Sequence, residues 1–150
     1  MNIRETFDFQ IRSTLFSMMR MYNLLVQDYG ITQGMGYTLM IIPKEGIPAT
    51  SIAPIMGMGS SSLSRLLKSM EKNDLIIKKA DEDDRRVTKI FLTNKGVQHR
   101  KEIKKVVLNF NSNVMKSLTE EEVKTYHKVS ETIKNQIESD LDKIQKKIFL

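Results

Sequence analysis

The chain has 150 residues, of which 40% are hydrophobic and 28% charged, so it is long enough to bury a core and too apolar to be disordered. It contains no cysteine, which excludes disulfides, thiolate metal sites and thiol redox sensing, and it has no apolar run long enough to span a membrane. The net charge of +6 favours a polyanionic partner. Residues 1–8 show no basic region followed by an apolar stretch, so no secretory signal is expected and a cytoplasmic protein is the expectation.

Two helices are predicted in the first 46 residues. Apolar residues recur every three or four positions from Phe7 to Val26, which indicates one long amphipathic helix ending near Gly30. Thr32 is a suitable N-cap for a second helix, and Pro43 would stop it.

Residues 50–73 are predicted to form two short helices separated by a glycine-containing turn at 57–59. If Ser51 is the N-cap of the first, Pro54 falls in the first turn, where its missing N–H breaks no helical hydrogen bond. The second helix opens with the three serines at 60–62, any of which could cap it.

The hydrophobic period then changes from that of a helix to that of strands. Residues 75–79 and 87–92 are rich in β-branched side chains, and the polar segment 80–86 between them predicts a hairpin. Four consecutive carboxylates, residues 81–84, could suggest a loop that binds a divalent metal. The spacing lacks the glycine and the terminal glutamate of a calcium loop, so no metal site is expected.

A basic helix follows the hairpin. Thr93 can cap it, and six cations between Lys95 and Lys116 are opposed by one acid, Glu102. Such a run is either a surface for a polyanion or a solvated helix face, and the sequence leaves both interpretations open.

The last helix begins with a capping box formed by Thr119 and Glu122. Its apolar stripe runs from Val123 to Ile148. A stripe of this length exceeds what the core of a small domain can cover, which favours contact with a helix of a second subunit.

Helix, turn, helix and hairpin, in this order within about 45 residues, predict a winged helix-turn-helix, in which the second helix enters the DNA major groove. The residues that carry this pattern resemble the MarR family of transcription regulators. They are Ile52-Ala53 with Gly57, Ser62-Leu63-Ser64-Arg65-Leu66-Leu67, Leu75-Ile76, Asp81-Glu82-Asp83-Asp84-Arg85-Arg86 and Phe91-Leu92-Thr93-Asn94-Lys95-Gly96.

The resemblance implies a fold that is mainly α with a small β-hairpin wing. The winged helix-turn-helix would occupy about residues 32–95 of a single domain, 1–150, flanked by dimerisation helices at 1–30 and 97–150. It also implies a homodimer that binds double-stranded DNA at a pseudo-palindromic operator. Such regulators typically repress until a ligand or an oxidant relieves binding; without cysteine, a small apolar or aromatic effector is the candidate.

Site residues follow from the resemblance position by position. Residues expected to contact DNA from the recognition helix and the wing are Ser60, Ser61, Ser62, Ser64, Arg65, Lys68, Arg85 and Arg86. Hydroxyls can bind phosphates or base edges, Arg65 can read guanine through two parallel hydrogen bonds, and Arg86 would enter the minor groove. Asp84 would orient the wing arginines.

Simpler interpretations stay open for several of these residues. The serines could be helix caps, and Arg65 could be solvated. Five methionines, Met18, Met19, Met21, Met35 and Met40, could line an adaptable effector pocket or could be ordinary core. A winged-helix module that binds a protein partner is the alternative function. The sequence has no cysteine nucleophile, no histidine recognisably paired with a carboxylate and no glycine-rich phosphate loop, so neither catalysis nor a cofactor is expected.

Overall fold

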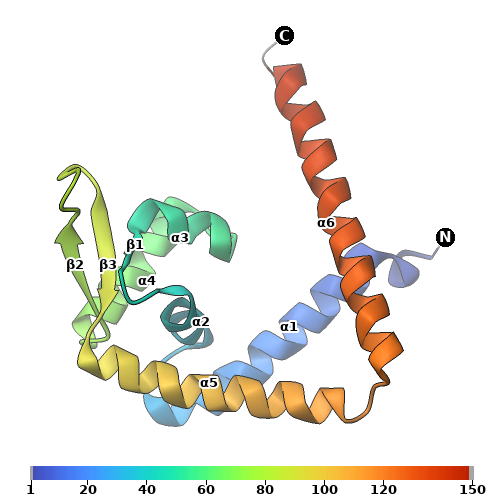
Figure 1. Cartoon of the computed structure of the whole chain (residues 1–150), viewed down its shortest axis with the longest axis horizontal. Coiled ribbons are helices and arrows are strands. Elements are labelled where there is room, and N and C mark those ends of the chain that lie inside the picture. Colours follow the sequence, from blue (N-terminus) through green and yellow to red (C-terminus); the bar gives the residue numbers. More distant parts are fainter. Residues whose placement is uncertain (1, 149–150) are drawn as a thin grey trace. The chain divides into compact units, whose positions relative to one another are not determined.

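The structure, a computed structural model, describes residues 2–148; residues 1, 149 and 150 of the predicted terminal segments lie outside the described part. It divides into two compact units, residues 1–107 and 108–150. Figure 1 shows the elements coloured along the sequence.

Within residues 2–148 there are six α-helices, two short 3-10 helices and three strands. In chain order they are η1 (Ile3–Glu5), α1 (Phe7–Val26), η2 (Gln27–Tyr29), α2 (Gln33–Ile41), β1 (Ile47–Pro48), α3 (Ala49–Met56), α4 (Ser60–Lys72), β2 (Ile76–Ala80), β3 (Thr88–Leu92), α5 (Asn94–Met115) and α6 (Glu120–Ile148). The chain is therefore mainly helical with a small antiparallel sheet, as the sequence predicted.

The sheet has the strand order β1-β3-β2 and is antiparallel throughout (Figure 1). The predicted hairpin is confirmed, with Ile76 opposite Leu92 and Ala80 opposite Thr88. The third strand, β1, was not predicted: its two residues show no alternation, and Pro48 is tolerated there because β1 lies at the edge of the sheet.

One core holds the first unit together. The fully buried side chains come from α2, α3, α4, β2 and β3, with contributions from the end of α1 and from α5. Buried core residues are Val26, Ile31, Met35, Leu39, Ile42, Ile52, Leu63, Leu67, Met70, Leu75, Ile76, Ile90 and Ile103. This core fixes the positions of α4 and the hairpin, since each supplies buried residues to it.

Three predicted helix caps are present. The Met35 N–H donates to the Thr32 hydroxyl at 3.3 Å, and the Gly96 N–H donates to the Thr93 hydroxyl at 2.9 Å. The capping box of α6 is reciprocal: the Glu122 N–H donates to the Thr119 hydroxyl, and the Thr119 N–H donates to the Glu122 carboxylate.

The predicted start of α3 is wrong. Its N-cap is Pro48 and not Ser51, and the helix begins at Ala49. Pro54 therefore lies inside the helix, beyond the first turn, where its ring nitrogen cannot donate to the Thr50 carbonyl. Burial of Ile52 in the core, rather than a capping side chain, holds this short helix in place.

The end of α4 has a non-glycine residue in the left-handed conformation. Asp74, with φ +56°, takes the left-handed conformation that a glycine commonly supplies after a helix. The Leu75 N–H donates to the Met70 carbonyl at 2.9 Å, which closes the helix end and turns the chain directly into β2.

Candidate nucleic-acid interface

Helix α4 has two sharply different faces. Leu63, Leu67 and Met70, at spacings of four and three, are buried in the core. The opposite face carries Ser61, Ser64, Arg65 and Lys68, whose spacing of three, one and three residues places them on a single stripe. All four are exposed, and the exposed Ser60 and Ser62 flank the stripe.

The serines at the start of α4 are not its caps. The N-cap is Gly59, which has no side chain, and no side-chain hydrogen bond caps the helix. The expectation that one of residues 60–62 caps α4 is therefore wrong. The hydroxyls at the N-terminal end of the helix remain available to an external acceptor or donor.

The cations on the stripe have no partner among the described residues. Within residues 2–148, neither Arg65 nor Lys68 makes a hydrogen bond or an ion pair, and both are exposed. Two unpaired cations beside a row of hydroxyls form a surface suited to the acceptors on DNA phosphates and base edges.

The loop between β2 and β3 is organised by Asp81. Its carboxylate accepts the N–H groups of Asp83 and Asp84, each at 3.0 Å, and forms an ion pair with Lys89 of β3. The Lys89 ammonium, followed by these backbone donors, lowers the pKa of Asp81, and the same ion pair raises the pKa of Lys89.

Asp84 binds Arg86 at three points. Its Oδ1 accepts the Arg86 backbone N–H at 3.0 Å and the Nε–H at 3.1 Å, while Oδ2 accepts from Nη2 at 3.3 Å. The guanidinium lowers the pKa of the Asp84 carboxyl. The Arg86 side chain is 90% exposed, so it is held while it projects into solvent. Arg85 is exposed and has no hydrogen-bond partner among the described residues.

Sequence reasoning missed the roles of Asp81 and Lys89. It considered Asp81 only as a member of an acidic run, although an aspartate at the start of a loop commonly accepts backbone N–H groups two or three residues later. That local signal was available; the ion pair with Lys89 required the register of the hairpin, in which residues 79 and 89 are opposite each other.

The basic run on α5 is partly occupied inside the chain. Arg100 donates to the Ile42 carbonyl at 2.8 Å, Lys95 donates to the Asn73 carbonyl, and Lys105 pairs with Glu102. These three cations therefore connect elements or neutralise an acid. Lys101 and Lys104 are exposed and make no bond with any described residue.

Two further features of residues 2–148 concern metal binding and membrane insertion. No group of three or more histidine, aspartate or glutamate side chains is arranged to hold a metal ion. No helix in the same range has both the length and the apolar character needed to cross a membrane.

Comparison with known proteins gives the same pattern over the winged part. Residues 39–88, from α2 to the first residue of β3, match the sequence model of the MarR family. The winged helix-turn-helix of this chain is of the MarR-family type. The chain is thus a DNA-binding transcriptional regulator, and the MarR family consists of regulators and not enzymes, which bears out the expectation that it does not catalyse a reaction.

A bacterial relative can be aligned with most of this chain. It is 23% identical over 125 residues to YybA of Bacillus subtilis (strain 168), an uncharacterized HTH-type transcriptional regulator, and the match covers 83% of each chain.

Two solved structures share its fold. A MarR-family regulator from Listeria monocytogenes, complexed with 26mer DNA, has a TM-score of 0.81 at 24% identity, covering 91% of both chains. The S. aureus MepR–DNA complex has a TM-score of 0.74 at 21% identity, covering 89% of this chain and 98% of MepR.

Proposed function

We propose that this MarR-family regulator is a cytoplasmic homodimeric repressor that reads a pseudo-palindromic operator. The observation that carries the proposal is the stripe of Ser61, Ser64, Arg65 and Lys68 on α4, which is exposed and unpaired opposite a buried apolar face. The N-terminal residues of such a helix reach base edges in the major groove, and phosphate contacts fix its position. The two similar structures solved with DNA are consistent with this use of the fold.

The wing supplies the second contact. Arg86, held by Asp84, would insert into the adjacent minor groove, where a narrow A·T tract concentrates negative potential. Arg85, which has no partner among residues 2–148, would bind a phosphate. Ser60 and Ser62, beside the stripe, would bind the backbone where the helix enters the groove.

Unpartnered apolar side chains on two helices support the homodimer. On α1, Phe7, Ile11 and Leu15 are between 49% and 64% exposed, and on α6, Ile137 and Leu141 are half exposed. A twofold pair would cover such faces and would match a twofold operator.

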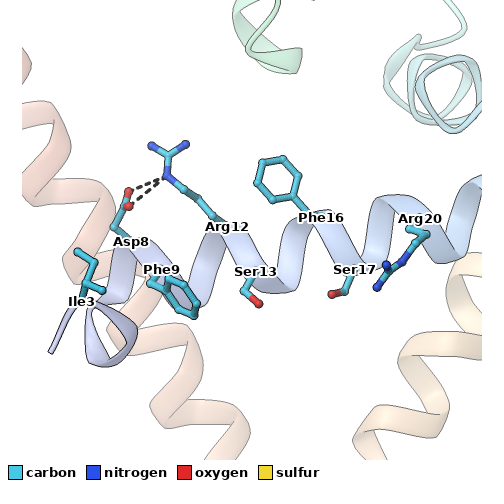
Figure 2. Close-up of a pocket in the computed structure, with 8 residues that line it drawn as sticks. All are labelled: Ile3, Asp8, Phe9, Arg12, Ser13, Phe16, Ser17 and Arg20. Atoms are coloured by element: carbon cyan, nitrogen blue, oxygen red, sulfur yellow. Dashed lines mark hydrogen bonds and ion pairs between the residues drawn. The ribbon is translucent and has the colours of Figure 1, made fainter.

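The surface of α1 also carries a hollow of about 510 Å³ formed by residues of η1 and α1 alone (Figure 2). The side chains that line it are Ile3, Asp8, Phe9, Arg12, Ser13, Phe16, Ser17 and Arg20. Apolar rings beside an Asp8–Arg12 ion pair form a surface that a second subunit could cover.

Relief of repression by a small apolar or aromatic effector completes the proposal. Met35 is a core residue, whereas Met18, Met19, Met21 and Met40 are half-buried. Their flexible side chains would line an adaptable pocket for an apolar ligand. Release of labelled operator by small aromatic compounds, with a thermal shift of the free protein as the binding control, tests this part.

The main experiment is fluorescence anisotropy on the DNA upstream of the gene, titrated with salt, against a scrambled duplex of the same length. Specific binding should weaken steeply with salt through counterion release. Arg65→Ala should reduce the affinity for the specific site by about 1–3 kcal/mol and relax the preference at one base position per half-site. Equal affinity of the wild type for both duplexes would instead favour a winged-helix module that binds a protein.

A further inference from the structure

Thr38 is a buried polar residue whose hydroxyl meets a sulfur atom. Its side chain is 0% exposed, and its hydroxyl proton lies within reach of two acceptors, the Gly34 carbonyl at 2.8 Å and the Met56 Sδ at 3.1 Å. A thioether is a weak acceptor, so the carbonyl within α2 takes the stronger share of the single proton. The sulfur contact links α2 to the last residue of α3.

Met56 lies at the junction between α3 and the turn that leads into α4. It ends α3, and Gly57, in the left-handed conformation at φ +61°, turns the chain through three residues into α4. Both α2 and α3 contact α4. A change in the distance between α2 and α3 at Met56 therefore acts directly on the orientation of the recognition helix.

Met56 is also accessible. It is half-buried, whereas Met35 and Met70 are 6% and 0% exposed. Among the described residues it is the methionine whose sulfur accepts a side-chain hydrogen bond. A small two-electron oxidant such as a peroxide can thus reach the Met56 side chain, whose sulfur contacts the buried Thr38 hydroxyl.

We propose that Met56 is an oxidation site whose conversion to the sulfoxide releases this regulator from DNA; the DNA part rests on the proposed function. The sulfur lone pair attacks one peroxide oxygen, an S–O bond forms and the O–O bond breaks. The thioether is oxidised by two electrons, and the peroxide is reduced to water.

The sulfoxide changes the contact with Thr38 in two ways. Its oxygen is a strong acceptor that competes with the Gly34 carbonyl for the single hydroxyl proton, and an oxygen placed between the sulfur and the Thr38 hydroxyl pushes α3 away from α2. It also places a polar atom at the edge of an apolar core, which favours separation of α3 from α2. Both effects disturb the support of α4.

The experiment treats the full-length protein with hydrogen peroxide and measures sulfoxide formation at each methionine by peptide mass spectrometry, together with operator affinity. The wild type should lose at least tenfold in affinity as Met56 is converted, and methionine sulfoxide reductases should restore it. Met56→Leu, which keeps the apolar volume, should bind like the untreated wild type and keep its affinity within twofold after treatment. Met115→Leu, at an exposed methionine outside the first unit (residues 1–107), should lose operator affinity on oxidation as the wild type does.

Two results would overturn the proposal: conversion of Met115 while Met56 stays reduced, or equal loss of binding by oxidised wild type and oxidised Met56→Leu. A third readout needs no DNA. Oxidation should increase hydrogen exchange of the amides of α2 and α3 in the wild type but not in Met56→Leu; unchanged exchange with Met56 fully converted also overturns it. If the reduced protein fails to bind any operator, the proposed function fails, while the exchange measurement still tests the oxidation site.

Discussion

Arg86 is an exposed side chain that the wing nevertheless holds in one place. Asp84 accepts three hydrogen bonds from it, two from the guanidinium and one from the backbone. An exposed pair of this kind adds little to folding stability, since solvent screens its charges and holding the side chains in one geometry costs entropy. In the proposed complex its effect is on DNA binding, where a long side chain that is already ordered loses less entropy.

Removal of the Arg86 guanidinium tests whether this side chain affects DNA binding without affecting folding stability. Arg86→Ala should weaken specific operator binding tenfold or more, which is about 1.4 kcal/mol, and should leave the thermal unfolding midpoint unchanged. Anisotropy and a thermal melt on the same sample measure the two effects. Arg85→Ala is the matched control, since Arg85 is the neighbouring exposed cation and has no partner among the described residues; it should have the smaller effect on specificity.

The Asp84→Asn variant distinguishes two effects of Asp84 on DNA binding: ordering of the Arg86 side chain and repulsion of the DNA by its negative charge. Removal of a negative charge near DNA should tighten binding if electrostatics alone matters. The amide oxygen of asparagine can still accept the Arg86 backbone N–H, but the variant loses the charged contact with the guanidinium, so ordering predicts weaker binding. An isotherm at fixed salt gives the sign, and tighter binding would leave Asp84 without an orienting role.

Two glycines should respond oppositely to substitution by alanine. A Cβ at Gly96 would lie 2.0 Å from the Leu75 carbonyl oxygen, so Gly96→Ala forces Leu75, the residue before β2, away from α5 and should destabilise by about 1–3 kcal/mol or more. A Cβ at Gly36, inside α2, meets only ordinary contacts with Ile103 at 3.7 Å, so Gly36→Ala should stabilise by about 0.5–1 kcal/mol. Urea unfolding of both variants checks the prediction; similar effects would mean that the contact between Leu75 and α5 relaxes easily.

At the scale of elements, the wing loop should depend on pH through Asp81. The pKa of Asp81 lies below its ordinary value of 3.8, chiefly because Lys89 donates to it. Order in the loop is therefore fully present above the ordinary pKa and is lost as the pH falls through the lowered one. The amide protons of Asp83 and Asp84 should titrate with a midpoint below 3.8 by NMR.

The control for this titration is Asp81→Asn, which keeps an oxygen acceptor for both amides but does not ionise. Its amide signals should not follow the midpoint seen in the wild type. A wild-type midpoint at or above 3.8 would show that the ion pair between Asp81 and Lys89 does not form in solution.

At the scale of the whole molecule, exposed apolar faces on α1 and α6 predict the assembly. Sedimentation should give about 35 kDa, twice the 17.3 kDa of the chain. Leu141→Glu, which places a charge on the α6 stripe where the side chain is 50% exposed, should shift the protein to monomer and abolish operator binding, while the α4 surface is unaltered. Glu138→Gln, an exposed change on the same helix, should stay dimeric, and a stable wild-type monomer at micromolar concentration would exclude the proposed architecture.

Much of the fold could be predicted from local patterns. The helical period of α1 and α4, the alternation in β3, and the caps at Thr32, Thr93 and Thr119 are short-range signals that need no knowledge of the rest of the chain. The exposed set on α4 followed from the same period, because residues opposite Leu63 and Leu67 must face away from the core.

The errors arose where packing overrides local preference. Ser51 and the serines at 60–62 are good capping residues, yet the helices begin at Ala49 and Ser60 because burial of Ile52 and Leu63 sets their positions. Asp74 occupies a left-handed position, although glycine or asparagine is commoner there.

The sequence by itself determined the order of elements, the winged helix-turn-helix and the exposed face of α4, since each follows from the spacing of apolar residues along the chain. Only the tertiary structure decided which charged and polar groups bind another part of the chain. Arg100 binds the Ile42 carbonyl, 58 residues away, and the Thr38 hydroxyl meets the Met56 sulfur across two helices. The physical reason is that such contacts depend on how separate elements pack against each other, and the period of a sequence contains no information about distance between its elements.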